Sequence, residues 1–196
     1  VVGYSGMLEE LAPDEPTRRR AREVHVAAER CARIVKRFLA MARSKPVEKK
    51  LVDVEGIIDD VVELAAYGLR VNGVEVIRDR APDLPAILAD ADQLHQVFMN
   101  LVLNAMQAMT SIEGRRRLII RTALRDQTIV IDVLDSGHGV NDVVKQRAFE
   151  PFFTTKPTGQ GTGLGLSLSY DIVKAHGGEL KVDTEEGKGS EFIITL

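Results

Sequence analysis

The sequence predicts an α+β protein, a two-layer α/β sandwich that follows an α-helical hairpin. Three observations support this fold class. In the first 43 residues, apolar side chains recur every three or four positions, which is typical of helices. From residue 51 onward, helix-like and strand-like patterns follow in the order α, β, α, β, β, α, β, β, which predicts helices on one face of a mixed or antiparallel sheet. A glycine-rich run, TTKPTGQGTGLGLS at 154–167, leads into the last helix.

The helical hairpin occupies the first part of the chain. Residues 1–11 carry an apolar stripe, which the two prolines of 12–16 interrupt. From Thr17 to about Arg43 the apolar spacing alternates between four and three, as in a helical bundle. Because so narrow a hairpin needs a partner, we expect a homodimer through it. A polar segment, SKPVEKK, follows as a linker, and the predicted domains are 1–46 and 47–196.

The second part alternates helical periods with short apolar runs. A polar, glycine-rich connection at about 137–162 exceeds ordinary loop length, so we interpret it as a functional lid. The expected elements are a helix at 54–69, a strand at 74–79, a long helix capped by Asp90 or Asp92, a strand hairpin at 117–124 and 128–135, a helix at about 163–176 ended by Gly177 and Gly178, and strands at 179–183 and 191–196.

Composition argues against several classes of partner. The net charge is −3, so no bulk attraction to nucleic acid or to an anionic membrane is implied. The single cysteine, Cys31, excludes an internal disulfide and fits a reducing compartment. No apolar run approaches the roughly 20 residues that cross a bilayer, so we expect no membrane segment in this chain. The chain opens in mid-pattern without a cap, from which we expect further residues upstream.

The glycine-rich run predicts an anion site. A glycine loop that passes into a helix start gathers backbone N–H groups and the positive helix end around one point, which suits a nucleotide phosphate chain. Neither the GxxxxGK[ST] pattern nor the GxGxxG pattern occurs in the run. The segment is therefore a phosphate loop of another kind.

Two asparagines lie inside an apolar helical stripe. Asn100 and Asn104 are four residues apart, so both amides leave the same face of the helix. One interpretation is that they only satisfy neighbouring backbone groups. The other is that they supply an oxygen ligand for Mg²⁺ and a second polar group near the phosphates.

The DSGHG segment ends a largely apolar strand with a carboxylate. Asp135 could accept a hydrogen bond from an exocyclic amine, while Gly137 and Gly139 let a ring approach the backbone. An ordinary strand-to-loop turn explains the same residues. His138 is expected to be a solvated loop residue.

The FEPFFTTK segment places three phenylalanines and Lys156 in the lid. We expect the phenylalanines to anchor the lid by burying apolar area against the sheet. Lys156 stands beside the glycine loop, and its side chain either contacts phosphate or is solvated.

Five motifs together resemble a known family. NLVLNA, DSGHG, FEPFF, GTGLGL and GKGSEF occur in the order and approximate spacing of the sensor histidine kinase catalytic domain, over residues of about 92–195. That domain has the Bergerat ATP-binding fold, shared with type II topoisomerases, ATPase-type chaperones and DNA mismatch-repair ATPases. The FFTTK and NAMQAM details are most similar to the nitrogen-regulation branch. Residues 17–43 resemble the second helix of the dimerisation and histidine-phosphotransfer domain.

The resemblance implies a role for each matching residue. Asn100 and Asn104 are the candidate catalytic residues, with Asn104 as the Mg²⁺ ligand. Asp135 would recognise the adenine amine, and Ser190 stands where the family commonly has threonine. Gln107 stands where many relatives have lysine. The residues implied to bind ATP are Asn100, Asn104, Asp135, Gly137, Gly139, Lys156, Gly161, Thr162, Gly163, Leu164, Gly165, Leu166 and Ser190.

The implied function is a histidine protein kinase core. It would bind ATP and Mg²⁺, donate the γ-phosphoryl group to a histidine, and pass it on to the aspartate of a response-regulator receiver domain. The implied location is the cytoplasm, either as a separate protein or as the cytoplasmic part of a longer, membrane-anchored sensor. The family's acceptor histidine, followed by an acidic residue and a proline, is absent; His25 is followed by Val26 and is expected at a surface or interface. The acceptor is expected upstream of Val1.

Three other functions fit parts of the pattern. A Bergerat-fold ATPase clamp would carry a carboxylate base one turn before the metal-binding asparagine, where this chain has Asn100. An anti-sigma-type serine kinase would not need the helical hairpin. A non-catalytic scaffold would not need the complete set of nucleotide motifs.

Overall fold

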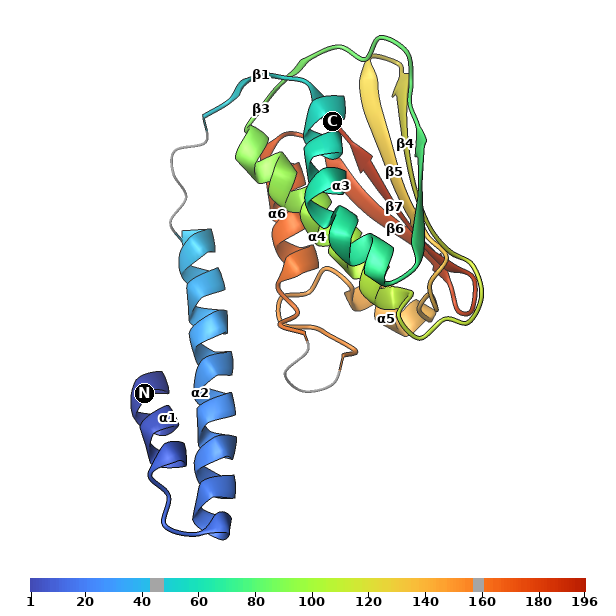
Figure 1. The fold of residues 1–196 in the computed structure, drawn as a ribbon. Coiled ribbons are helices and arrows are strands. Elements are labelled where there is room, and N and C mark those ends of the chain that lie inside the picture. Colours follow the sequence, from blue (N-terminus) through green and yellow to red (C-terminus); the bar gives the residue numbers. More distant parts are fainter. Residues whose placement is uncertain (43–47, 157–160) are drawn as a thin grey trace. The chain divides into compact units, whose positions relative to one another are not determined.

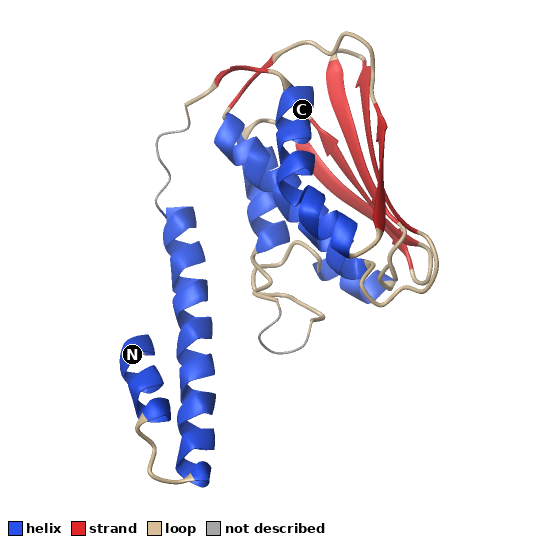
Figure 2. Cartoon of the chain, in the orientation of Figure 1, coloured by secondary structure: helices blue, strands red, loops and turns tan. Residues whose placement is uncertain are grey.

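The computed structural model describes residues 1–42, 48–156 and 161–196. The chain divides into two compact units (Figures 1 and 2). One comprises Val1–Pro46 with Lys156–Thr162, and the other comprises Val47–Thr155 with Gly163–Leu196. Within the described residues, no helix is long and apolar enough to cross a membrane.

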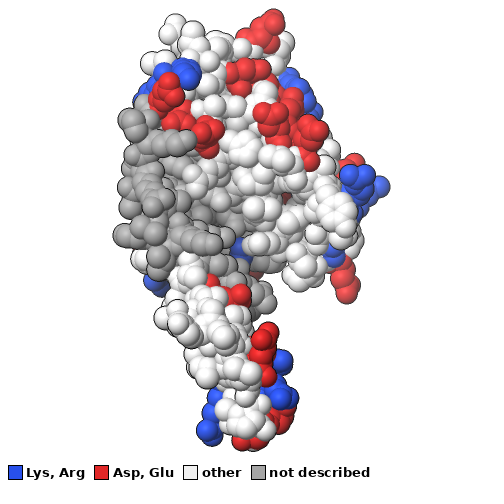
Figure 3. Space-filling view, turned by 60° about the vertical axis from the view of Figure 1, so that its left-hand side comes forward, with Lys and Arg blue, Asp and Glu red and all other residues white. Residues whose placement is uncertain are grey.

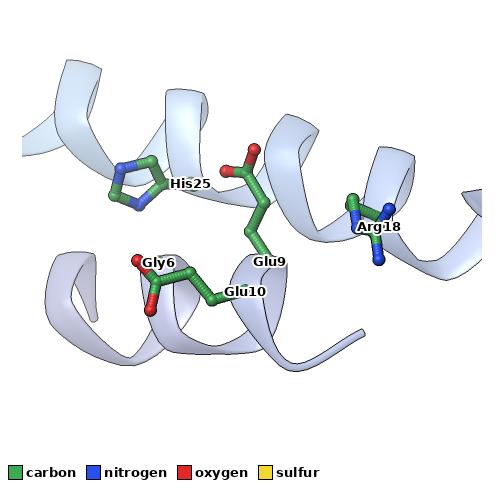
Figure 4. Close-up of a pocket in the computed structure, with 5 residues that line it drawn as sticks. All are labelled: Gly6, Glu9, Glu10, Arg18 and His25. Atoms are coloured by element: carbon green, nitrogen blue, oxygen red, sulfur yellow. The ribbon is translucent and has the colours of Figure 1, made fainter. Parts of the chain in front are cut away.

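The first unit contains the expected pair of helices, α1 (Val2–Glu10) and α2 (Glu15–Ala42). The imidazole of His25 on α2 packs against Gly6 and Ser5 of α1, with Nδ1 3.0 Å from Ser5 Oγ. A shallow pocket lies between the helices, and Figure 4 shows its lining. The lining residues are Gly6, Glu9, Glu10, Arg18 and His25. His25 is thus half-buried inside the hairpin.

The second unit is a five-stranded sheet with helices on one face (Figures 1 and 2). The strand order is β2-β4-β5-β7-β6, with β2 parallel to β4 and every other pair antiparallel. This confirms the two-layer sandwich and shows that the sheet is mixed. The strands are β2 (Val74–Asp79), β4 (Arg116–Arg125), β5 (Thr128–Asp135), β6 (Glu179–Glu185) and β7 (Gly189–Thr195).

Three helices cover the inner face of this sheet: α3 (Val54–Val71), α4 (Ala91–Ala108) and α6 (Gly165–Ala175). Their apolar stripes and the inward side chains of the strands form one core. Leu94, Val97 and Leu101 of α4 are fully buried, so α4 lies at the centre of that core. Burial of three such side chains fixes α4 by several kcal/mol, at roughly 2 kcal/mol each.

Caps and turns set the ends of these elements. Asp90 is the N-cap of α4, and its Oδ1 accepts a hydrogen bond from the Gln93 backbone N–H over 3.1 Å. This decides between the two caps that the sequence allowed. Asp126 and Gln127 both have positive φ, which makes the tight turn between β4 and β5.

Three short elements, β1, β3 and α5, were not expected from the sequence. β1 (Lys50–Val52) pairs antiparallel with β3 (Ile87–Ala89) outside the main sheet. The helix α5 (Asp142–Arg147) lies inside the connection interpreted as a lid, where Asn141 caps it by accepting from the Val144 N–H over 3.1 Å. Segments of three to six residues are too short for a hydrophobic period to reveal.

The surface of the molecule mixes both signs of charge. On the face drawn in Figure 3, acidic side chains lie in several groups and basic side chains lie mostly at the margins. Among the coloured residues of that face there is no continuous basic surface.

Candidate functional site

The site is built where the middle of α4 meets the start of α6. Asn100 on α4 donates from Nδ2 to the Gly165 carbonyl oxygen and to Ser169 Oγ, each over 3.3 Å. Ser169 is fully buried, and its hydroxyl donates to the same Gly165 oxygen over 3.0 Å. Because the proton of Ser169 is already used, its oxygen serves Asn100 as an acceptor.

These contacts fix which way the Asn100 amide faces. Its nitrogen points to two acceptors, so its oxygen, Oδ1, points away from them. No donor among the described residues forms a hydrogen bond with that oxygen. Asn100 therefore does bond to neighbouring protein groups, which was one of the two interpretations of the sequence, and its Oδ1 remains available to a ligand. Asn104 is half-buried one helical turn further along the same face.

A buried carboxylate lies at the end of β5. Asp135 is 8% exposed, and its Oδ1 accepts from the Gly137 backbone N–H over 2.8 Å. Burial raises the pKa of Asp135 to about 6, while hydrogen bonds from the N–H groups of Gly137 and Ser190 and the nearby His138 act in the opposite direction. No described lysine or arginine forms a salt bridge with Asp135. A buried anionic acceptor without an ion pair is a candidate partner for a ligand donor group.

The two glycines of this segment are required by the protein's own packing. A Cβ atom at Gly139, where φ is +61°, would lie 2.1 Å from the Glu185 carbonyl oxygen. A Cβ at Gly137 would lie 2.5 Å from Asp135 Oδ1 and 2.8 Å from the Ala108 Cβ. Protein atoms therefore occupy the Cβ positions of both glycines, so these positions are not open to a ligand ring.

The tip of the β6–β7 hairpin completes this side of the site. Ser190 pairs with Asp135 in the register of β7 and β5. Thr184 Oγ1 lies 3.0 Å from Ser190 Oγ, donates to the Gly189 carbonyl oxygen and accepts from the Val140 N–H. Sequence reasoning missed Thr184 and Ser169. The signal for Thr184 was present, because the alternation of Leu180 and Val182 with polar neighbours places it on the inner face.

The start of α6 carries the predicted loop residues that belong to this unit. A Cβ at Gly163, where φ is +66°, would lie 2.3 Å from the Phe152 carbonyl carbon, so this glycine fits against the FEPFF segment. A Cβ at Gly165 would approach nothing closer than Asn100 Cγ at 3.7 Å. Leu164 is buried and Leu166 packs against the core. Gly165 therefore lies beside Asn100 without a close contact at its Cβ position.

The phenylalanines of the FEPFFTTK segment agree only in part with the expectation, and Lys156 and the first residues of the glycine loop lie outside this unit. Phe149 packs on the core beside Tyr170, with ring centroids 5.3 Å apart, but Phe152 is 61% exposed. The expectation that all three phenylalanines are buried was wrong for Phe152, which lies at a tight turn of the backbone with a φ of +67°. Lys156, Gly161 and Thr162 belong to the other compact unit, so the structure gives no geometry relating them to this site.

His138 is exposed, as expected for a loop residue, and its Nδ1 lies 2.5 Å from the Gly139 carbonyl oxygen. Within the described ranges there is no cluster of three or more His, Cys, Asp or Glu side chains that could hold a metal ion. A metal ion at this site would therefore depend on amide oxygens, water and ligand oxygens, a set that suits Mg²⁺.

Comparison with known proteins gives consistent matches. Residues 89–196 match the family described as histidine kinase-, DNA gyrase B-, and HSP90-like ATPase. Sporulation kinase E of Bacillus subtilis is 36% identical over 163 residues, which are 83% of this chain and 22% of that protein. Sensor histidine kinase ZraS of Escherichia coli is 35% identical over 170 residues, which are 86% of this chain and 35% of that protein.

A solved structure extends the match in three dimensions. The crystal structure of full-length ShkA in complex with AMPPNP has a TM-score of 0.75 and 27% identity, and the match covers 100% of this chain and 42% of that chain. The chain spans between 22% and 35% of the length of the two curated relatives.

Proposed function

The chain belongs to the family of histidine kinase-, DNA gyrase B- and HSP90-like ATPases, as a sensor histidine kinase catalytic ATP-binding domain, and from this premise we propose that it binds Mg-ATP and donates the γ-phosphoryl group to a histidine. The phosphoryl group then passes to the aspartate of a response-regulator receiver domain. In this proposal residues 47–196 bind the nucleotide, and residues 1–46 form the dimerising hairpin.

The buried Asp135 supports the nucleotide half of the proposal. Its carboxylate is held at the end of β5 by N–H donors on two sides, so its remaining acceptor capacity has a fixed direction. An exocyclic amine, such as that of adenine, is the donor this acceptor suits. Ser190 and Thr184 add hydroxyl groups beside it.

The asparagines of α4 support the metal half. Asn100 Oδ1 and the Asn104 amide leave the same helical face, next to the first residues of α6. An amide oxygen with waters and phosphate oxygens is a donor set that Mg²⁺ accepts. Bound Mg²⁺ would neutralise phosphate charge, and the N–H groups at the start of α6 would orient the phosphates.

One observation favours phosphoryl transfer to a side chain over ATP hydrolysis. ATPases of this fold carry a carboxylate base on the same helix, one turn before the metal-binding asparagine. Here that position is Asn100, and its nitrogen is engaged with Gly165 and Ser169. An amide is not a proton acceptor at neutral pH, so it cannot activate a water molecule as a base.

The hairpin supports a dimer as part of the proposal. The apolar side chains of Tyr4 and Leu8 on α1, and of Leu11 at its C-cap, are 78%, 62% and 76% exposed. A second copy would remove them from water. None of the four histidines of this sequence is followed by an acidic residue, so the acceptor histidine must be offered separately in a test.

The deciding experiment incubates this chain with γ-labelled ATP, Mg²⁺ and a histidine-bearing dimerisation helix joined ahead of Val1. Acid-labile, base-stable label on the added histidine is the expected result. Label on serine, or release of free phosphate alone, would contradict a histidine kinase. A matched chain with that histidine replaced by glutamine is the control, and it should stay unlabelled.

A further inference from the structure

A single imidazole joins the end of α6 to the start of α4. The Asp90 backbone N–H donates to His176 Nε2 over 3.0 Å, and His176 Nδ1 lies 2.8 Å from the Ile172 carbonyl oxygen. A carbonyl oxygen only accepts, so Nδ1 carries the proton and Nε2 carries the lone pair. His176 is therefore the neutral Nδ1–H tautomer. It occupies one N–H at the α4 N-cap and one carbonyl in the last turn of α6.

The same two helices are joined again at the nucleotide site. There Asn100 donates to the Gly165 carbonyl oxygen and to Ser169 Oγ. Asp90 and Asn100 are about 15 Å apart along α4, from the helical rise per residue. The antiparallel pair is thus held at the start of α4 and again near its middle, and both helices contribute buried side chains, such as Val97 and Val173, to the same core.

Two further contacts converge on the same junction. Glu48 N–H donates to Asp90 Oδ2 over 3.3 Å, and Lys49 Nζ donates to the Ala175 carbonyl oxygen over 3.2 Å. Asp90 Oδ1 is already engaged with the Gln93 N–H. The junction therefore ties together α4, α6 and the segment that leads into β1.

We propose that His176 is a positioning residue of the nucleotide site. By tying the last turn of α6 to the N-cap of α4, it fixes how far α6 extends along α4 and how it is rotated. That fixes the position of Gly165, and of the N–H groups at the start of α6, relative to Asn100 and Asn104. Since misplacement of a binding group by about 1 Å is enough to weaken a site strongly, a distant tie can control affinity. The inference rests on the proposed function.

The first test needs no substitution. Long-range proton–nitrogen NMR correlations of the imidazole rings in the whole 196-residue chain identify the tautomer of each histidine. The Nδ1–H form is expected for His176 at neutral pH. The Nε2–H form would overturn the proposal, because Nε2 could not then accept from Asp90.

The second test compares three variants by Mg-ATP titration and by the side-chain NH₂ resonances of Asn100. His176→Phe keeps a ring but loses both contacts, whereas His176→Gln keeps an acceptor near the position of Nε2. His95→Phe is the matched control, because His95, on α4, is half-buried like His176, and its side chain forms no hydrogen bond within the described residues. We expect His176→Phe to weaken Mg-ATP binding by about fivefold and to shift the Asn100 resonances. His176→Gln should restore most of both, and His95→Phe should change neither.

The outcomes separate this inference from the proposed function. Unchanged affinity and unchanged Asn100 resonances in His176→Phe would overturn the positioning role. If His176→Phe does not fold, the wild-type tautomer and the His176→Gln variant decide. If the wild-type chain does not bind Mg-ATP, the proposed function fails, while the tautomer and the Asn100 resonances still judge the tie between the helices.

Discussion

Asn100 and Ser169 lie on facing helices, and the amide of Asn100 donates to the hydroxyl oxygen of Ser169 over 3.3 Å. This contact turns the amide oxygen of Asn100 toward the ligand side. It is a partly buried hydrogen bond between side chains far apart in the sequence, so it depends on the packing of α4 against α6.

Ser169→Ala should weaken Mg-ATP binding. The change removes one of the two acceptors of Asn100 Nδ2, so the amide loses part of its orientation. We expect a loss of about 1 kcal/mol, or roughly five- to tenfold in Kd, by isothermal titration. Ser167→Ala is the matched control, since Ser167 is also buried on α6 but, within the described residues, its hydroxyl bonds only to the Leu164 carbonyl oxygen. Equal losses in the two variants would contradict the role of Ser169.

Asn104→Asp should weaken ATP binding by about tenfold or more in Mg²⁺. The added negative charge near the phosphates opposes binding, although a carboxylate can still hold the metal. Affinities measured with Mg²⁺ and with EDTA separate the two effects. Relative to the wild type, the variant should lose more affinity in EDTA than in Mg²⁺, because in EDTA no cation offsets the added charge. Unchanged affinity in both conditions would refute the assignment of Asn104.

The sequence predicted the parts of this fold that local patterns determine. The apolar period of α4 and the β5 run that ends at Asp135 are as expected, and Asp90 is one of the two caps that the sequence allowed for α4. Contacts across long sequence distances were not visible in advance. Gly139 needs its missing Cβ because of the Glu185 carbonyl oxygen, and no spacing rule links those residues. The tie between His176 and Asp90 is of the same kind.

Asp135→Asn should weaken ATP binding by about tenfold or more. The amide nitrogen of asparagine cannot accept from the adenine amine, and only one oxygen remains for the N–H groups of Gly137 and Ser190. Asp132→Asn is the matched control on the same strand, because alternation places Asp132 on the opposite face of the sheet. Fluorescence titration with an ATP analogue measures both. A similar loss in the two variants would point to net charge instead.

The ionisation of Asp135 should make stability fall as pH rises. Burial raises the pKa of Asp135 from 3.8 to about 6, so the folded state holds this proton more tightly than the unfolded state. Below roughly pH 4 the carboxyl group is protonated in both states. Between about pH 4 and pH 6 it ionises in the unfolded state while the folded state keeps its proton, so the free energy of unfolding falls as pH rises. The accumulated cost at neutral pH is about 3 kcal/mol. Urea unfolding at several pH values should show this fall in wild type relative to Asp135→Asn, and parallel curves would contradict it.

Gly139→Ala should destabilise the protein far more than Gly187→Ala. Both glycines have positive φ, +61° and +81°, so an alanine costs about 1 kcal/mol of backbone strain at either position. At Gly187 the new methyl group meets nothing within 4 Å, whereas at Gly139 it would lie 2.1 Å from the Glu185 carbonyl oxygen. The DSGHG segment and the β6–β7 tip would then have to separate, breaking the bond from Gly187 N–H to the His138 carbonyl oxygen. We expect a further loss of about 2 kcal/mol for Gly139→Ala in urea unfolding. Equal losses would show that the backbone conformation, and not the contact with Glu185, requires glycine at this position.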